Sequence, residues 1–208
     1  PDPGIREAAI EALAQLKVRE AIPHLIRALE DGHASVRGGA ALALAALDAR
    51  EAKPALERLL KEPTLDGVRA AAALCLLGSG SGVPLLLNTD GYAWVYRPYL
   101  NALRAPASWR RLKEGRLSRP LSGTRQEVLE SLSREIGLPI TLAEADPDLR
   151  RSGLHIDHRQ GRVSWMDALE ETVRGGLYDI VLEDAHIRLV PIRDASRLWK
   201  EWWRRQRD

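Results

Sequence analysis

The sequence of 208 residues contains one cysteine, one methionine and no phenylalanine. A single cysteine, Cys75, excludes an internal disulfide and any cysteine-based zinc site. It occupies a small-residue position of an alanine- and leucine-rich segment, aligned with Ala12 and Ala43, which favours a buried structural thiol. A reactive thiol is the alternative, but an apolar setting opposes it because burial raises a thiol's pKa.

Long apolar runs are also lacking. No run approaches the roughly 20 residues that a membrane-spanning helix needs, although 45% of the residues are hydrophobic. We therefore expect a folded core and no transmembrane segment. The sequence begins with Pro1 rather than Met, and a repeat pattern is already under way at Asp2. A removed leader or further repeats fit this start, so the lack of a signal peptide excludes no compartment.

A strong charge of one sign is the next absence, since the net charge is +2. Residues 1–90 carry 10 basic against 12 acidic side chains, and residues 120–192 carry 8 against 13. Two shorter stretches are basic, with 6 against 1 in residues 104–119 and 6 against 3 in residues 193–208. Solvated linker charge explains these stretches, and contact with a polyanion or an acidic partner is the alternative.

What the first half does contain is an internal repeat. Three similar segments follow one another, namely GIREAAIEALAQL (residues 4–16), SVRGGAALALAAL (35–47) and GVRAAAALCLLG (67–78). Ile5, Val36 and Val68 correspond in this alignment, each followed by an arginine, with spacings of 31 and 32 residues. The apolar residues recur with the helical period, so each segment predicts an amphipathic helix.

A second helical segment follows each of the first two, AIPHLIRALE from Ala21 and AKPALERLL from Ala52. Pro23 and Pro54 stand near the start of these segments, where proline is tolerated because a first-turn N–H has no intrahelical acceptor. A third, shorter copy surrounds Pro84. A period of about 30 residues built from paired amphipathic helices predicts helical hairpins stacked into an α-solenoid.

The first helix of this unit resembles the HEAT repeat, and more closely the phycobilisome-lyase HEAT-like repeat, which reads roughly Asp-x-x-Val-Arg-x-x-Ala-Ala-x-Ala-Leu. The residues of the first copy that fit are Asp2, Ile5, Arg6, Ala9 and Leu13. His33 replaces the aspartate in the second copy, and Asp66 is one place out of step in the third. The resemblance covers about residues 1–90 and implies an array of HEAT-like hairpins, a fold that mostly binds other proteins.

Aromatic residues make up only 5% of the chain, yet four of them gather within eight residues after the repeats. They are Tyr92, Trp94, Tyr96 and Tyr99. Large side chains at this point predict a cap that closes the open end of the array. A partner-binding patch is the alternative. Residues 91–115 are interpreted as this aromatic cap followed by a basic linker.

From about Arg116 the pattern changes to short alternating segments. RLSRPL predicts an opening strand, and a helix follows that is capped by Thr124 with Glu127 three residues on, and that ends at Gly137. LPITL and GLHIDH predict strands, and VSWMDALEETVRGG predicts a second helix capped by Ser164. LYDIVLED and HIRLVPI predict a closing hairpin with one buried face. On it, Ile180, Leu182, Ile187 and Leu189 point inward and alternate with outward-facing Asp179, Val181, Glu183, His186, Arg188 and Val190. Two helices on one face of a small mixed sheet make an α+β domain.

The segment VSWMDALEETVRGGLYDIVLEDAHIRLVPI from Val163 resembles the secretin and TonB N-terminal short domain. The landmarks of that domain are an acidic residue before Ala-Leu, a Gly-Leu exit and a closing hairpin. The residues on these landmarks are Asp167, Ala168, Leu169, Gly176 and Leu177. The match covers about residues 116–192, with a longer loop at residues 143–153 than the pattern requires. It implies a periplasmic docking module without catalysis.

A catalytic constellation is absent from the sequence. His155, Asp157 and His158 are close together, but on a strand His155 and Asp157 point one way and His158 the other. Ser122 and Ser164 precede helices, where capping is the ordinary role of a serine, and no Gly-x-Ser-x-Gly segment is present. We therefore expect no enzymatic activity, no metal and no cofactor.

The last stretch, residues 193–208, predicts a helix rich in tryptophan and arginine. Trp199, Trp202 and Trp203 fall at i, i+3 and i+4, so a helix carries all three indoles on one stripe. The stripe either packs on the chain's own surface or docks into a partner's groove through aromatic anchors and a basic rim. A helix at a membrane interface is a third possibility.

These features favour a non-catalytic scaffold or docking protein of the bacterial cell envelope. The expected location is the periplasm or envelope, with the cytoplasm as the alternative. The expected partner is another protein, an envelope assembly being one candidate, and the sequence does not predict the oligomeric state. The residues expected to bind the partner are Trp94, Tyr96, Trp199, Trp202, Trp203 and Arg204.

Two other functions compete with the scaffold. A nucleic-acid-binding helical-repeat protein is the second hypothesis, because Trp109 stands beside Arg110 and Arg111. The net acidic charge of the repeats argues against it. A chromophore-lyase-like enzyme is the third hypothesis and rests on the resemblance of the repeats alone.

Overall fold

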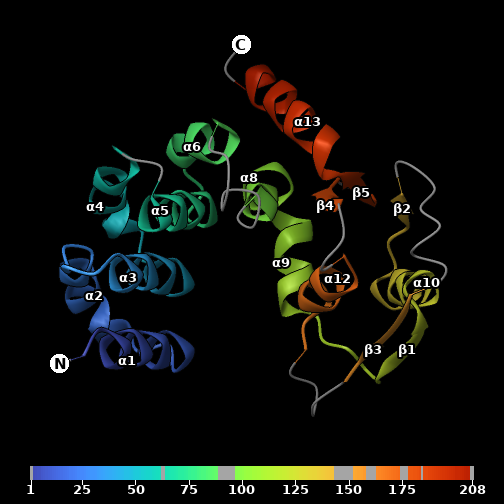
Figure 1. Cartoon of the computed structure of the whole chain (residues 1–208), viewed down its shortest axis with the longest axis horizontal. Helices are drawn as coiled ribbons and strands as arrows, with labels where there is room; N and C mark the ends of the chain where they lie inside the picture. Colours follow the sequence, from blue (N-terminus) through green and yellow to red (C-terminus); the bar gives the residue numbers. More distant parts are fainter. Residues whose placement is uncertain are drawn as a thin grey trace. The chain divides into compact units, whose positions relative to one another are not determined.

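The computed structural model contains helical repeats in its first half and a small sheet region in its second half (Figure 1). It divides into two compact units, residues 1–103 (unit 1) and residues 104–208 (unit 2). The residues that the structure describes are 2–61, 64–88, 97–142, 152–157, 163–173, 178–183 and 185–206. Trp94 and Tyr96, with most of the predicted aromatic cap, lie outside them.

Unit 1 consists of three successive helical pairs. The first helices of the pairs are α1 (Pro3–Gln15), α3 (Ala34–Ala46) and α5 (Leu65–Leu76). The second helices are α2 (Ile22–Ala28), α4 (Lys53–Arg58) and α6 (Val83–Asn88), each entered through a short 3₁₀ turn, η1 (Arg19–Ala21), η2 (Arg50–Ala52) and η4 (Gly80–Gly82). A further turn, η3 (Leu59–Lys61), follows α4. The predicted hairpins are therefore present.

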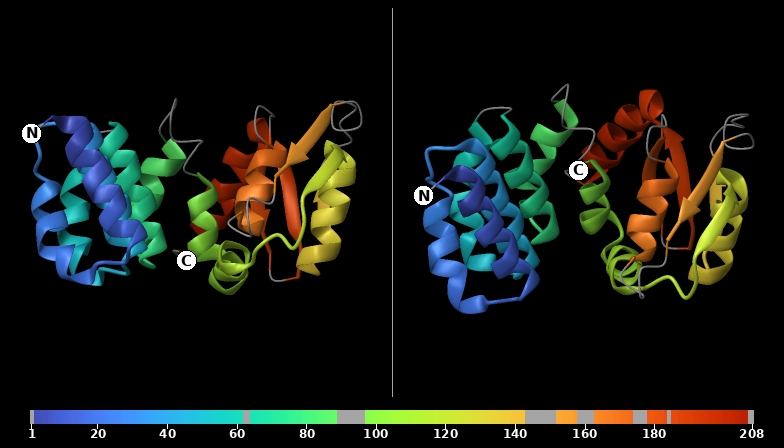
Figure 2. Two further views of the ribbon diagram at one scale, coloured as in Figure 1. Left: turned by 90° about the horizontal axis from the view of Figure 1, so that it is seen from below. Right: turned by 60° about the horizontal axis from the view of Figure 1, so that its bottom comes forward.

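The three first helices lie side by side, with α3 between α1 and α5 (Figure 1, Figure 2). These helices share an apolar core with α2 and α4, in which at most 1% of the surface of each of Leu25, Leu44, Leu56 and Leu74 is exposed. After α6, the described part of unit 1 continues with η5 (Arg97–Leu100), and α8 (Asn101–Arg104) crosses into unit 2. Unit 1 contains no strand among its described residues, as the repeat predicted.

The first helices all end in the same backbone motif. The N–H groups of Val18, Ala49 and Ser79 donate to the carbonyls of Leu13, Leu44 and Leu74, respectively. The residue before each donor is left-handed, with φ of 54° at Lys17, 49° at Asp48 and 75° at Gly78. This pattern is a Schellman cap, which satisfies carbonyls that a helix end leaves unpaired.

These caps correct the predicted alignment of the third copy. Leu13, Leu44 and Leu74 are equivalent, so the spacings at this end are 31 and 30 residues, not 31 and 32. Cys75 therefore corresponds to Ala14 and Ala45 rather than to Ala12 and Ala43. The physical reason is that α5 has 12 residues where α1 and α3 have 13. Its run of alanines contains no distinctive residue by which the sequences could be aligned.

Unit 2 contains four main helices and five strands among its described residues. The helices are α9 (Pro106–Glu114), α10 (Arg125–Ile136), α12 (Trp165–Val173) and α13 (Ile192–Arg205). The strands are β1 (Leu121–Thr124), β2 (Ile140–Leu142), β3 (Gly153–Ile156), β4 (Tyr178–Leu182) and β5 (Ile187–Pro191). The opening strand begins at Leu121 rather than at Arg116.

The strands form two sheets instead of the single mixed sheet that was predicted. β1 and β3 make an antiparallel pair with Leu121 opposite Ile156. The other sheet has the order β2-β5-β4, with β2 parallel and β4 antiparallel to β5. The closing hairpin of β4 and β5 is thus confirmed, and the three-stranded sheet is mixed.

The predicted helix caps are present in unit 2. Thr124 and Glu127 form a capping box at the start of α10, and Gly137 ends that helix in the left-handed region with φ of 71°. At the start of α12, Ser164 Oγ accepts from the Asp167 N–H at 3.0 Å, while the Asp167 carboxylate accepts from the Ser164 N–H at 3.2 Å. These reciprocal bonds satisfy two otherwise unpaired N–H groups at each helix start.

Two further predictions for unit 2 were wrong. The three-stranded sheet is not open on one face, because Asp179, Val181 and Val190 are buried together with the apolar residues that alternate with them. α12 packs on β4, and α13 packs on both β4 and β5. In addition, residues 106–114 form α9 rather than a linker, because Trp109 and Leu112 are buried and α9 packs against α12. No helix in the described residues has the length and apolarity to span a membrane.

Candidate protein-binding groove

The tryptophans of α13 do not share one environment. Trp199 has 0% of its surface exposed, whereas Trp202 and Trp203 are half-buried and Arg204 is exposed. The Trp199 indole Nε1 donates to Asp179 Oδ2 at 3.3 Å, and the Arg104 guanidinium lies 5.7 Å from the centre of its ring. Trp199 therefore belongs to the core of unit 2 and holds α13 on the sheet.

The other face of α13 is basic and in contact with solvent. Its exposed cationic side chains are Arg197, Lys200, Arg204 and Arg205. Glu201 interrupts the row, with its carboxylate 4.0 Å from the Arg197 guanidinium. On α9, Arg110 is exposed and Arg111 donates to the Ile136 carbonyl at 2.5 Å. The exposed cationic side chains of α13 thus form a solvated basic row.

A second cluster of unit 2 surrounds one carboxylate. Glu183 lies 3.5 Å from Arg104, 3.2 Å from Arg188 and 3.2 Å from the His186 imidazole. Trp202 lines the hollow beside these residues. The cluster links Arg104 of α8 to the β4–β5 turn, and the Glu183 carboxylate is already paired with the two arginines.

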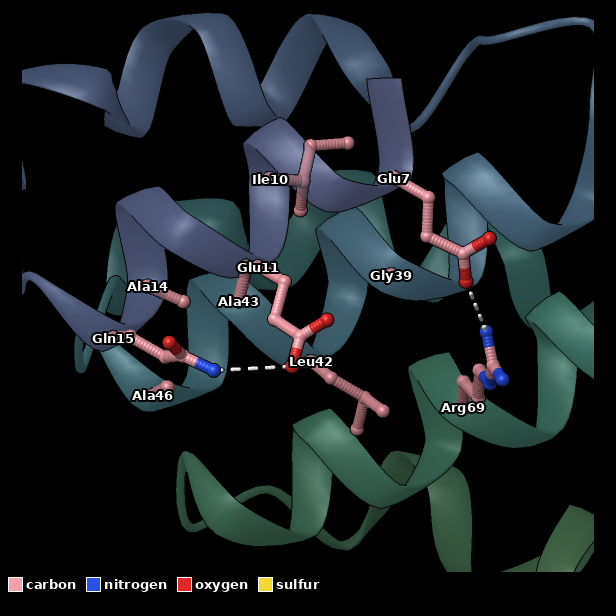
Figure 3. A pocket seen from close by; sticks show the side chains of 10 residues that line it. All are labelled: Glu7, Ile10, Glu11, Ala14, Gln15, Gly39, Leu42, Ala43, Ala46 and Arg69. Carbon is pink, nitrogen blue, oxygen red and sulfur yellow. Dashed lines mark hydrogen bonds and ion pairs between the residues drawn. The ribbon is translucent and has the colours of Figure 1, made fainter. Parts of the chain in front are cut away.

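A concave surface with a largely apolar lining lies in unit 1, between α1 and α3 (Figure 3). Its volume is 420 Å³, and it is hereafter called the α1–α3 groove. The residues that line it are Glu7, Ile10, Glu11, Ala14 and Gln15 from α1, Gly39, Leu42, Ala43 and Ala46 from α3, and Arg69 from α5. Two successive copies of the repeat therefore form its walls, and the third copy contributes one residue.

Small side chains create the hollow. Gly39, Ala43 and Ala46 fall at i, i+4 and i+7 of α3 and so lie along one line of that helix. A methyl group at Gly39 would lie only 3.7 Å from Glu7 Cγ and 4.0 Å from Ile10 Cγ2, which is ordinary contact. Glycine is therefore not demanded here by backbone strain, and its effect is to leave room. Leu42 supplies a half-buried apolar side chain within the hollow.

The rim of the α1–α3 groove is acidic. Glu7 lies 3.6 Å from the Arg69 guanidinium, and Glu11 accepts from the Gln15 side-chain amide at 3.0 Å (Figure 3). The Arg69 Nη1 also approaches the Ser35 carbonyl at 3.5 Å. Glu7 is thus paired with a cation, whereas the exposed carboxylate of Glu11 accepts from the neutral amide of Gln15. An apolar floor beside two carboxylates suits a partner that carries an apolar side chain flanked by a cationic one.

Arginine-aspartate pairs fix the spacing of the helices that form the groove. Arg6 binds Asp31 through two hydrogen bonds of 2.8 and 2.7 Å, and Arg37 binds Asp66 at 2.6 Å. In both pairs the arginine of one first helix reaches a carboxylate at the start of the next. Arg69 instead reaches back to Glu7, which agrees with the corrected alignment, since it is not equivalent to Arg6 and Arg37.

The two aspartates of these pairs have lowered pKa values for different reasons. The hydrogen bonds from Arg6, and then the His33 N–H, hold the pKa of Asp31 below its ordinary value. For Asp66, burial by itself raises the pKa, but the bonds from Arg37 and Thr64 outweigh it, so the pKa is lowered overall. One oxygen of Asp66, Oδ1, is buried without a hydrogen-bond partner, so this carboxylate depends on Arg37.

The residues singled out for chemistry are not brought together. Among the described residues, no group of three or more His, Cys, Asp or Glu side chains is placed to hold a metal ion. His155 is exposed on β3, and His158 lies outside the described part of the chain. Cys75 is fully buried, as predicted, and burial raises the pKa of its thiol to about 12. A thiol in that state is a poor nucleophile at neutral pH.

Sequence reasoning missed the α1–α3 groove. The signals were present, namely the carboxylates of Glu7 and Glu11 on one line of α1 and the small residues at Gly39, Ala43 and Ala46. They become meaningful only once α1 and α3 are known to lie side by side. Aromatic residues are the stronger signal in the sequence, because four of them gather within eight residues.

Comparison with known proteins identifies the first unit only. The family model of HEAT repeats matches residues 1–77, which confirms the resemblance to the HEAT repeat over that range. No curated protein and no solved structure matches the chain. The resemblance of residues 116–192 to the secretin and TonB short domain has no such support.

Proposed function

We propose that the chain is a non-catalytic scaffold that binds another protein in the α1–α3 groove. The observation that carries this proposal is the apolar floor of the groove beside Glu7 and Glu11, built on repeats of a type that commonly holds protein partners. The contact expected is an apolar side chain over Leu42 and Ala46, with a lysine or arginine beside the carboxylates. Its polar rim would make the association dependent on salt.

Site-specific cross-linking tests the proposal on the full chain. A photoreactive amino acid replaces Leu42 in the groove, and in a matched control it replaces Glu51, which is exposed outside the groove. Each chain is exposed to envelope and cytosolic extracts with and without nuclease, and the products are identified by mass spectrometry. We expect a protein that cross-links from position 42 and not from position 51, and that survives nuclease treatment.

Three results would count against the proposal. Identical products from positions 42 and 51 would show non-specific collision. A nuclease-sensitive product from position 42 would indicate nucleic acid in the groove. Conversion of the captured molecule into a product would indicate an enzyme and would favour the chromophore-lyase-like hypothesis.

The same experiment addresses the proposed location. The resemblance of residues 116–192 to a periplasmic docking module supports an envelope partner, and that part of the proposal is independent of the groove. A partner recovered from the envelope fraction agrees with it. A partner found only in the cytosolic fraction overturns the envelope location and leaves the scaffold function in place.

Nucleic-acid binding is retained as a second candidate because Arg110 and the exposed face of α13 are basic. The acidic rim of the groove opposes it, so we expect weak binding without sequence preference. A sub-micromolar affinity at physiological salt that Arg110→Glu with Arg111→Glu abolishes would place this function first. Salt titration with a labelled duplex measures it.

A further inference from the structure

The strand β2 forms one edge of the three-stranded sheet of unit 2, because the strand order is β2-β5-β4. On its inner side it pairs with β5, where the Ile187 N–H donates to the Pro139 carbonyl at 2.9 Å. In a parallel pair, Ile187 bonds to the residues on either side of Ile140, so the N–H and C=O of Ile140 point away from β5. Those of Leu142, two residues on, point the same way. No other described strand pairs with this side of β2.

Two rows of apolar side chains cross the sheet and end at this edge. Ile140 and Leu142 are the members on β2, and paired residues of neighbouring strands point to the same face of a sheet. The other members, on β5 and β4, are Ile187, Leu189, Ile180 and Leu182. Those four have at most 1% of their surface exposed, whereas Ile140 and Leu142 are half-buried. The rows are therefore covered in the middle of the sheet and only partly covered at β2.

A groove of 430 Å³ lies between β2 and α10, and it is hereafter called the β2–α10 groove. The residues that line it are Gln126, Leu129, Glu130, Ser133 and Arg134 from α10, with Ile140 and Leu142 from β2. Leu129 is buried, and Glu130 and Arg134 are exposed. The groove thus carries one charge of each sign, so apolar contact and backbone pairing, rather than net charge, define what fits it.

We propose that the edge of β2 and the β2–α10 groove bind an extended segment of a partner protein, which adds a fourth strand to the sheet. Such a strand pairs with the outward N–H and C=O groups of Ile140 and Leu142, and every second side chain continues the apolar rows toward Leu129. The segment therefore carries apolar residues at positions i and i+2. A helix in the groove would cover the apolar side chains but leave these backbone groups without a strand partner. The site belongs to unit 2 and does not rest on the α1–α3 groove.

Random octapeptides displayed on phage and selected on the full chain supply the probes. One peptide of each enriched family is synthesised with a fluorescent label, and its affinity is measured by anisotropy. We expect a family whose binding Leu142→Asp weakens at least about tenfold. Thr141→Asp is the matched control, because Thr141 is exposed and points to the other face of the same strand. It should change the affinity less than about twofold, as should Leu42→Glu in the α1–α3 groove.

Methylation of the peptide backbone tests the strand pairing itself on the wild-type chain. Each peptide nitrogen is methylated in turn, which removes one N–H donor. In an added strand every second N–H points toward β2, so methylation at alternate positions should weaken binding at least about tenfold, and methylation between them less than about threefold. Gln126→Trp, which fills the groove from α10 and leaves β2 unchanged, should abolish binding too and keeps the site testable if Leu142→Asp does not fold.

Three results would overturn the proposal. No enriched family may distinguish the wild type from either groove variant, which would mean that the groove binds no extended peptide. Equal losses at neighbouring methylated positions would show that the peptide does not pair as a strand. A wild-type chain that sediments as a dimer, with Leu142→Asp a monomer, would identify the occupant as a second copy of the chain. None of these results bears on cross-linking at Leu42, so the two proposals fail separately.

Discussion

Units 1 and 2 reach a stable core by different routes. Unit 1 uses one local plan three times, with a Schellman cap at the end of each first helix and an arginine that reaches a carboxylate of the next copy in two of them. In the described part of unit 2, each strand pairs in its own way and Trp199 provides a single large contact between α13 and the sheet. Unit 1 thus repeats similar small contacts, whereas unit 2 adds one large aromatic contact, that of Trp199, to an apolar core built from different elements.

The difference also decides where a binding surface can form. Small residues of α3, namely Gly39, Ala43 and Ala46, face longer side chains of α1, so a groove arises between the two helices. In unit 2, Trp109 and Trp199 are buried, whereas Trp202 and Trp203 are half-buried. Trp199 thus stabilises the fold, while alanines and glutamates of unit 1 line the candidate site.

The largest expected effect comes from a charge in the shared core of unit 1. Leu44 has 0% of its surface exposed, so Leu44→Asp buries an unpaired carboxylate and should lower the free energy of unfolding by about 3 to 5 kcal/mol. Urea or thermal unfolding measures this loss. Leu16→Asp, at an exposed leucine, is the control and should cost less than about 0.5 kcal/mol. Equal losses for both variants would contradict the assignment of the core.

The next largest effect concerns Trp199, which holds α13 on the sheet of unit 2. Trp199→Ala removes a fully buried indole together with its hydrogen bond to Asp179, and should cost about 3 to 4 kcal/mol. Trp203→Ala, at a half-buried tryptophan of the same helix, should cost clearly less. Near-ultraviolet circular dichroism combined with urea unfolding follows both variants. A Trp199 variant as stable as the Trp203 variant would mean that α13 is not held through Trp199.

The Arg37–Asp66 pair gives a smaller effect that depends on pH. Arg37→Met leaves the buried carboxylate of Asp66 without its main partner and should cost about 1 to 3 kcal/mol at pH 7. The native pKa of Asp66 is lowered, so the stability from this pair is complete above the unfolded pKa of about 3.9 and is lost as pH falls through the folded pKa. In the variant the hydrogen bond from Arg37 is lost while the burial that opposes the charged form remains, so protonation of Asp66 relieves the unpaired charge.

The stability difference between wild type and Arg37→Met should therefore shrink as pH falls from 6 toward 3. Urea midpoints at several pH values measure it. Arg6→Met is the matched control, because its partner Asp31 is more exposed than Asp66, and its cost should be smaller at every pH. A difference that grows on acidification would refute the assigned role of Arg37.

The smallest effect is the loss of one helix cap in unit 2. Thr124→Ala removes the side-chain half of the capping box of α10 and should cost about 1 kcal/mol. Ser122→Ala, two residues earlier at an exposed side chain, should be close to neutral. Hydrogen exchange of the first turn of α10 detects the change locally. Unchanged protection in the Thr124 variant would mean that the cap is not needed.

The sequence predicted the parts of the fold that local rules determine. The helical hairpins, the capping box at Thr124, the end at Gly137 and the β4–β5 hairpin all follow from residues that are neighbours in the chain. The alignment of α5 could not be predicted, because a run of alanines looks the same after a shift of one or two residues. The helix α9 was taken for a linker because its charges outnumber its two buried side chains, Trp109 and Leu112.

The arrangement of unit 2 could not be predicted from the alternation of polar and apolar residues in its strands. Val181 and Val190 were interpreted as outward-facing, since a strand with one polar and one apolar face fits a sheet open on one side. They are buried because α13 covers that side, and no local pattern places one helix on a given sheet face. The groove was missed for the same reason, as its walls come from different copies of the repeat.

Whether the α1–α3 groove binds a protein partner is tested directly by comparing the affinity of that partner for the wild type and for two variants. The partner identified by cross-linking at Leu42 is titrated against the wild type, Leu42→Glu in the groove and Ala12→Glu at an exposed residue of α1 that does not line the groove. We predict that Leu42→Glu weakens binding at least about tenfold, equivalent to 1.4 kcal/mol, while Ala12→Glu leaves the affinity unchanged. Equal affinity for the wild type and Leu42→Glu, with both variants folded, would show that the partner does not bind in the α1–α3 groove.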